Sequence, residues 1–233
     1  MKEDLKSIEA QIADLSIEQA MAFLAQQFPN AVKFSSAFGQ EDQVITDVIF
    51  KNKLEVEVFT LDTGRLFPET YELIEKTRSR YNQNIKTYYP SPQSLEPMVH
   101  EKGLFSFYES VENRKQCCYI RKVEPLKRAL KDTKVWITGL RASQSENRQN
   151  FGLLEWDDAN QVIKYNPLLN WSFDQMIDYL KVHNVPYNTL HDKGFISIGC
   201  QPCTRAIVDG EDPRAGRWWW EASQKECGLH AVK

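Results

Sequence analysis

No segment of this sequence has the pattern of a membrane span or a secretory signal. Residues 1–30 carry charged side chains near the start and then an amphipathic helical pattern, without an apolar run that leads to a small-residue cleavage site. Hydrophobic residues make up 42% and charged residues 26% of the chain, which is ordinary for soluble globular proteins. The composition disfavours disorder and a membrane class, and we expect a cytoplasmic protein without a membrane partner.

An excess of positive charge is missing as well. The 29 Lys and Arg are outnumbered by 32 Asp and Glu, so the net charge is −3. Nonspecific binding to nucleic acid needs a strong positive field that displaces condensed counterions. We therefore expect no nucleic-acid partner, and any anionic ligand must be met by a local cluster of cations.

Repeats, low-complexity tracts and linkers are also absent, and 233 residues suffice for one substantial core. Alternating strand and helix patterns indicate an α/β class with a parallel sheet. Strands are predicted at 32–34, 56–59, 85–89 and 135–138, with a hairpin over 153–165 that turns at 158–160. Helices are predicted from the capping boxes at Ser16 and Ser172, from Gln40, over 67–81 and through most of 94–130. Periodicity is lost from Asp192 onward, and we expect one domain over 1–233.

Two predicted strands end in loops that suit a nucleotide. Ser35-Ser36-x-x-Gly39 and Leu61-Asp62-Thr63-Gly64 both lie at the carboxyl ends of strands, where open parallel sheets bind ligands. Small residues before a helix let backbone N–H groups and the helix dipole approach a phosphate. The two loops could form the floor of one pocket, although an ordinary strand-to-helix turn explains the first loop equally well.

Cysteine is scarce but grouped. Of five cysteines, Cys117 and Cys118 are adjacent and Cys200 and Cys203 form a CxxC, whereas Cys227 stands apart. In a reducing cytoplasm the four grouped thiols suggest metal or cluster binding, with convergence only through the tertiary fold. From the residues alone an iron-sulfur cluster, a single zinc ion and plain core packing all remain open.

Basic residues near the loops and cysteines could clamp an oxyanion. Arginine is suited to fork-like contacts with phosphate or sulfate, although each residue alone reads as a surface charge. The candidates are Lys122, Arg141, Arg148, Arg214 and Arg217. Cys227 lies between Lys225 and His230, whose positive charge would favour a thiolate; an exposed cysteine without a role is the alternative.

Five separated motifs, taken in order, resemble the adenylyl-sulfate reductase family. They are Ser35–Asp42, Leu61–Gly64, Cys117-Cys118, Cys200-x-x-Cys203 and Lys225–His230, and the resemblance covers roughly residues 30–230. It implies a Rossmann-like, adenine-nucleotide α-hydrolase-type parallel sheet flanked by helices, with a mobile C-terminal segment over 208–233. ATP pyrophosphatases of this group usually carry a Ser-Gly-Gly-x-Asp-Ser loop, which is absent here, so ATP cleavage is disfavoured.

The resemblance also implies roles for individual residues. Cys117, Cys118, Cys200 and Cys203 would ligate one 4Fe-4S cluster per subunit, which tunes the site without net redox, and Cys227 would be the nucleophile. Lys122 would lie between cluster and substrate, while Arg214 and Arg217 would face the sulfate. The remaining substrate-binding positions would be Ser35, Ser36, Gly39, Leu61, Thr63, Gly139, Arg148 and His230.

The implied activity is reduction of adenosine 5'-phosphosulfate to sulfite and AMP through a cysteine thiosulfonate, in sulfate assimilation and cysteine biosynthesis. Thioredoxin or a glutaredoxin-like protein would be the reductant, and a homo-oligomer is compatible with the sequence. Two alternatives are a 3'-phosphoadenylyl-sulfate reductase or dual-substrate enzyme, and a non-catalytic zinc-stabilised nucleotide-binding module.

Overall fold

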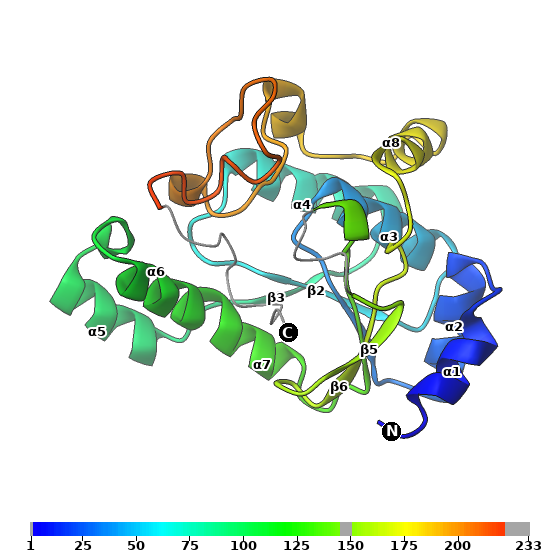
Figure 1. Cartoon of the computed structure of the whole chain (residues 1–233). Coiled ribbons are helices and arrows are strands. Elements are labelled where there is room, and N and C mark those ends of the chain that lie inside the picture. Colours follow the sequence, from blue (N-terminus) through cyan, green and yellow to red (C-terminus); the bar gives the residue numbers. More distant parts are fainter. Residues whose placement is uncertain (1, 145–150, 222–233) are drawn as a thin grey trace. The chain divides into compact units, whose positions relative to one another are not determined.

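The computed structural model describes residues 2–144 and 151–221 (Figure 1). A six-stranded sheet has the order β3-β2-β1-β4-β6-β5. Its strands are β1 (Val32–Ser35), β2 (Glu57–Leu61), β3 (Lys86–Tyr88), β4 (Val135–Ile137), β5 (Leu154–Asp157) and β6 (Val162–Tyr165). β1 pairs in parallel with β2 and β4, and β4 pairs in parallel with β6, whereas β5 is antiparallel to β6. The predicted α/β fold and hairpin are confirmed.

The chain divides into two compact units. Unit 1 comprises Met1–Thr60, Thr70–Lys86 and Leu130–Asn188, and unit 2 comprises Leu61–Glu69, Thr87–Ala129 and Thr189–Lys233. This division does not test whether residues 1–233 form a single domain, so that expectation remains a prediction. No helix among the described residues is both long and apolar enough to cross a bilayer.

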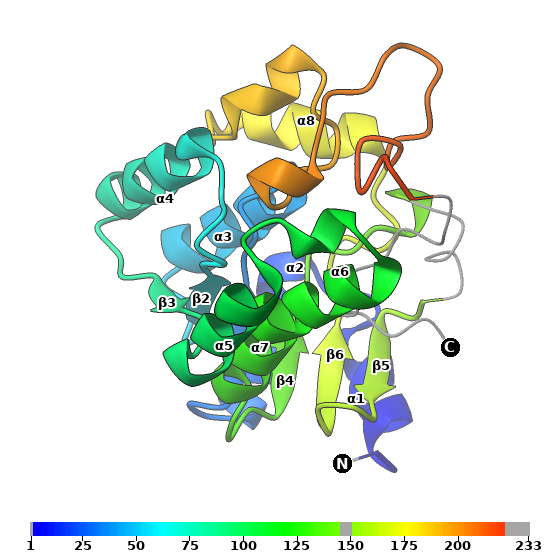
Figure 2. The ribbon, with the colours of Figure 1, turned by 90° about the vertical axis from the view of Figure 1, so that its left-hand side faces the viewer.

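Unit 1 contains most of the sheet. Its helices are α1 (Leu5–Ile12), α2 (Ile17–Gln27), α3 (Gln40–Lys51), most of α4 (Pro68–Tyr81) and α8 (Phe173–Val182). The capping boxes predicted at Ser16 and Ser172 are present, each with a glutamine as its third residue. Figure 2 shows β4, β6 and β5 side by side. Apolar side chains of the central strands, such as Phe34, Ile137 and Ile163, are fully buried in the core of this unit.

Unit 2 is largely helical and irregular. It contains α5 (Pro92–Lys102), α6 (Val111–Cys118), a π-helical turn (Tyr119–Val123) and α7 (Glu124–Ala129). Figures 1 and 2 both place α5 beside the continuous segment formed by α6, the π-helical turn and α7. Gly103 ends α5 with φ +80°, a conformation that L side chains rarely adopt. Beyond residue 192, the described part contains short 3₁₀ turns but no α-helix or strand, as the lost periodicity predicts.

Candidate functional site

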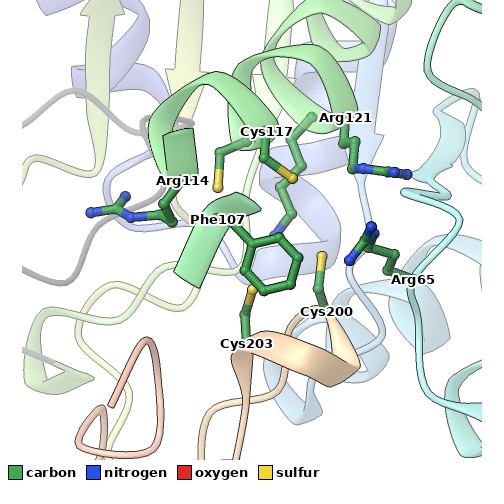
Figure 3. A pocket seen from close by; sticks show the side chains of 9 residues that line it. Arg65, Phe107, Arg114, Cys117, Arg121, Cys200 and Cys203 are labelled. Carbon is green, nitrogen blue, oxygen red and sulfur yellow. The ribbon is translucent and has the colours of Figure 1, made fainter. Parts of the chain in front are cut away.

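The four grouped cysteines line one pocket of unit 2. Cys117 and Cys118 are in the last turn of α6. Cys200 directly precedes the 3₁₀ turn Gln201–Cys203, and Cys203 is the last residue of that turn. Each is 8% exposed, and the pocket has about 290 Å³ of space without atoms, part of it open to solvent. Figure 3 shows the sulfurs of Cys200 and Cys203 on the side of the pocket that faces Cys117. Cysteines that are about eighty residues apart in the sequence therefore line the same pocket.

Local structure fixes the position of each cysteine pair. Ser110 caps α6 by accepting a hydrogen bond from the Asn113 amide at 3.1 Å, and the helix widens into the π-helical turn directly after Cys118. The turn that carries the second pair is held by its backbone, because the Cys203 amide donates to the Cys200 carbonyl at 2.9 Å. The Gln201 amide also donates to the Arg65 carbonyl at 2.8 Å, which ties this turn to the residues after Gly64.

Cationic side chains surround the thiols. Arg65, Arg114, Arg121 and Lys122 line the pocket together with the cysteines. Arg121 is 6% exposed and donates from Nη1 to the Thr63 carbonyl at 2.6 Å, while its buried Nε has no hydrogen-bond partner in the described part of the chain. Such a ring of cations suits an anionic occupant, since each thiolate brings a negative charge into a buried space.

The environments of the thiols differ. Burial raises the pKa of Cys117, and the positive charge of Arg121 opposes this shift. Burial, followed by the nearby Cys200 and Cys118, raises the pKa of Cys203 to about 12. Burial also acts on Cys200, but Lys122, a 3.3 Å hydrogen bond with Thr63 Oγ1 and the charge of Arg217 outweigh it and lower its pKa. Thr63 and Lys122 therefore favour the thiolate of Cys200.

The four thiols do not converge on a single point. Among the described residues, no group of three or more His, Cys, Asp or Glu has the spacing that holds one metal ion. A tetrahedral zinc site would need every sulfur at about 2.3 Å from the same centre. In an iron-sulfur cluster, by contrast, each cysteine binds a different iron and the sulfurs stand further apart. The four thiolates are a donor set that such a cluster takes.

Arg217 forms hydrogen bonds with the loop before Cys200. Its guanidinium is buried, donates from Nη1 to Ser197 Oγ at 3.2 Å and to the Ile198 carbonyl at 3.3 Å, and lies 4.8 Å from the centre of the Trp218 ring. A Cβ atom on Gly199 would lie only 2.3 Å from Nη2 of this arginine, so a larger residue there would displace the guanidinium. Arg214 is half-buried, and its backbone N–H donates to Asp212 Oδ1 at 2.8 Å. Sulfate binding by these arginines stays a prediction.

The predicted phosphate loop in unit 1 is closed by a carboxylate. Asp42 Oδ2 accepts from the amides of Ala37 at 2.7 Å and Gly39 at 3.4 Å, and the Phe38 amide donates to Ser36 Oγ. Ser35 Oγ accepts from the Trp136 indole at 2.8 Å. A phosphate could use the Ala37 and Gly39 amides only after displacing Asp42. The predicted role of this loop in phosphate binding remains untested.

The other predicted residues fall into three groups. Gly139 packs against Asp42 in unit 1, while Leu61 ends β2 and Thr63 and Lys122 adjoin the cysteines in unit 2. Arg148, Cys227 and His230 lie outside the described residues. Sequence reasoning missed the pocket residues Arg65, Phe107, Arg114 and Arg121. Arg114 and Arg121 gave a signal, because residues three and four positions apart share a helix face and this spacing separates each of them from Cys117 and Cys118.

Comparisons with known proteins agree over most of the chain. The model of the phosphoadenosine phosphosulfate reductase domain matches residues 31–206. An adenosine 5'-phosphosulfate reductase from Allochromatium vinosum is 50% identical, with 86% of this chain and 79% of the relative covered. A protein of the same name from Burkholderia cepacia is 48% identical, with coverages of 92% and 87%.

Comparison with solved structures indicates the same family. The phosphoadenylyl-sulfate reductase from Candida auris, in a phosphate complex, has a TM-score of 0.74 at 31% identity, with 89% of this chain and 98% of that chain covered. An FMN adenylyltransferase from Candida glabrata has a TM-score of 0.54 at 17% identity, with coverages of 99% and 85%, and shares the fold alone. The chain therefore belongs to the phosphoadenosine phosphosulfate reductase family.

Proposed function

We propose that this protein is an adenosine 5'-phosphosulfate reductase, an oxidoreductase that forms sulfite and AMP in sulfate assimilation and cysteine biosynthesis. The observation that carries the proposal is a four-cysteine pocket in a chain whose relatives at 48–50% identity have this name. The four described cysteines carry free thiols.

We further propose that Cys117, Cys118, Cys200 and Cys203 hold one 4Fe-4S cluster. Two features support this: the four buried thiols that line one pocket, and the cations beside them. When bound, the cluster supplies a compact charged centre that tunes the electrostatics of the site without net redox. Lys122 would serve both cluster and substrate, since its positive charge already acts on Cys200 and Cys203.

Cys227 is the nucleophile in this proposal. Its thiolate attacks the sulfur of the substrate, the bond from that sulfur to the bridging phosphate oxygen breaks, and AMP leaves with the electron pair. Cys227 then carries a thiosulfonate. Lys122, Arg214 and Arg217 would offset the charge that builds on the phosphate and the transferred sulfonate.

A dithiol protein such as thioredoxin completes the reaction. One of its thiolates attacks the Cys227 sulfur and releases sulfite, and its second thiol resolves the mixed disulfide, which restores the Cys227 thiol. The two electrons that reduce the sulfonate thus come from the dithiol, which leaves as a disulfide. A homo-oligomer remains compatible with this scheme.

The test replaces the nucleophile. Unmodified enzyme without reductant should release about one AMP per active site and gain a sulfonate mass on the peptide that contains Cys227, because the first step stops at the covalent intermediate. Cys227→Ser should keep its iron and sulfide and still bind nucleotide, but form no adduct. An adduct on another cysteine, or normal turnover by Cys227→Ser, would show that the assigned mechanism is wrong.

The solved 3'-phosphoadenylyl-sulfate reductase among the similar structures makes that substrate a second candidate. The same assay, run with both nucleotides, separates the two. We expect faster adduct formation with the substrate that lacks the 3'-phosphate, because the curated relatives bear the name of the enzyme that acts on it. A clear preference for the 3'-phosphorylated nucleotide would reassign the substrate.

A further inference from the structure

A buried ion pair joins the helix of the first cysteine pair to a residue far along the chain. Arg114 on α6 donates from Nε to Glu221 Oε1 at 2.9 Å and from Nη2 to Glu221 Oε2 at 2.8 Å. The two side chains are only 2% and 5% exposed. The guanidinium also lies 4.7 Å from the centre of the Trp218 ring, which leaves it enclosed on that face.

The ion pair fixes the orientation of the two segments that it joins more than it stabilises the fold. Removing two charges from water costs free energy that their attraction seldom fully offsets, so a buried pair is a weak stabilising element. A planar guanidinium that binds both carboxylate oxygens, however, sets both the distance and the angle between its two segments. A second contact ties the residues before Glu221 to the turn of the other cysteine pair, because the Trp218 amide donates to the Cys203 carbonyl at 3.2 Å.

The positions of Arg114 and Glu221 in the chain indicate which two segments the ion pair connects. Arg114 lines the four-cysteine pocket, and Figure 3 shows its guanidinium directed away from the Cys117 sulfur. Glu221 directly precedes the segment 222–233, which contains Cys227. Six residues span at most about 20 Å when fully extended, so the position of Glu221 limits where the Cys227 thiol can reach.

We propose that Arg114 and Glu221 are positioning residues that anchor the segment carrying the nucleophile to the helix carrying Cys117 and Cys118. This inference rests on the proposed function, in which Cys227 attacks the substrate. A fixed starting point reduces the volume that the thiol explores and raises its effective concentration at the substrate. The pair thereby couples the position of the nucleophile to the cysteine pocket without touching the substrate.

The test uses the full-length enzyme with its iron retained and two substitutions, Glu221→Gln and Arg114→Lys. Each keeps a polar side chain of similar length but removes the doubly bonded ion pair. In single turnover with adenosine 5'-phosphosulfate, adduct formation should slow at least tenfold, because misplacement by about one ångström can cost a hundredfold. Trypsin cleavage after Lys225 should become faster, while iron content and the nucleotide Kd should stay unchanged.

A second bidentate pair in the same unit provides the matched control. Arg205 binds both Glu211 carboxylate oxygens, at 2.8 and 2.9 Å, but is more exposed and lies away from the pocket lining. Glu211→Gln should change neither the adduct rate nor the rate of trypsin cleavage.

Three results would overturn the inference. Loss of iron and nucleotide binding in both variants would show that the pair only maintains the fold. Unchanged cleavage after Lys225 together with an unchanged adduct rate would show that Glu221 anchors nothing. Equal effects from Glu211→Gln would show that the response is nonspecific. If the unmodified enzyme forms no adduct on Cys227, the proposed function fails, yet the cleavage rates still report whether Glu221 is an anchor.

Discussion

At the residue scale, the carboxylate of Asp42 organises the first loop of the sheet. It is 9% exposed and accepts from the amides of two loop residues, Ala37 and Gly39. Such acceptors satisfy amides at the N-terminus of a helix that have no intrahelical partner. Two glycines lie beside this carboxylate, but they differ in the space they leave. A Cβ atom on Gly139 would lie 2.2 Å from Asp42 Oδ1, whereas one on Gly39 would lie at 3.7 Å or more from its nearest neighbours.

These contacts predict a clear difference between two alanine substitutions. Gly139→Ala should destabilise the protein by about 1–3 kcal/mol, because the buried Asp42 side chain must move and release its amide partners. Gly39→Ala should cost less, since its Cβ makes ordinary contacts and only the preference of the helix N-cap for glycine over alanine is lost. Thermal unfolding of the two variants measures this, with about 2–4 °C expected per kcal/mol for a chain of this size. Equal melting temperatures would show that Asp42 moves aside without cost.

At the element scale, α6 supplies more of the residues that line the cysteine pocket than any other element does. It supplies Arg114, Cys117 and Cys118 from eight residues, and it begins at a serine cap. So short a helix has little intrinsic stability in isolation and depends on its packing and its cap. Its C-terminal end continues into the π-helical turn that carries Arg121 and Lys122. Fraying at the cap would therefore loosen one whole side of the pocket.

Removal of this cap should be measurable. Ser110→Ala leaves the Asn113 amide without its acceptor and should lower the free energy of unfolding by about 1 kcal/mol, with faster iron release to a chelator. Ser110→Asp keeps an acceptor and serves as the control. Identical iron-release rates in the two variants would show that packing alone holds the helix.

Local signals explain which elements could be predicted from the sequence. Only residues close together in the sequence determine the capping boxes at Ser16 and Ser172 and the apolar strand runs. The sequence alone therefore predicts these elements. The π-helical turn has no comparable local pattern. Arg65 reached the pocket through contacts with segments far away in sequence, as in its carbonyl bond to the Gln201 amide. Spacing could group the cysteines but could not show that Arg65 lies beside them.

At the scale of the whole molecule, the two units have different kinds of core. The core of unit 1 consists of aliphatic and aromatic side chains from its helices and strands, such as Leu24, Ile45 and Ile163. In unit 2 the buried cluster has eight members, and four of them are the pocket cysteines. Burial of apolar area is the main source of folding free energy, so a core of which half the members are cysteines depends more on any group that their thiols bind.

The difference predicts which part of the chain will respond when the proposed cluster is removed. After anaerobic treatment with a chelator, amide hydrogen exchange should become faster in Thr87–Ala129 and Thr189–Glu221 of unit 2, because four buried thiols and the cations around them lose their shared partner. The amides of β1, β4 and β6 in unit 1 should keep their protection, since their core contains none of these cysteines. Comparison of exchange by mass spectrometry before and after chelation gives both results in one experiment, and restoring iron and sulfide should reverse the change. If the strands of unit 1 lost protection as strongly as α6 and α7, the two cores would unfold together, and the iron site would stabilise the entire chain instead of its own unit.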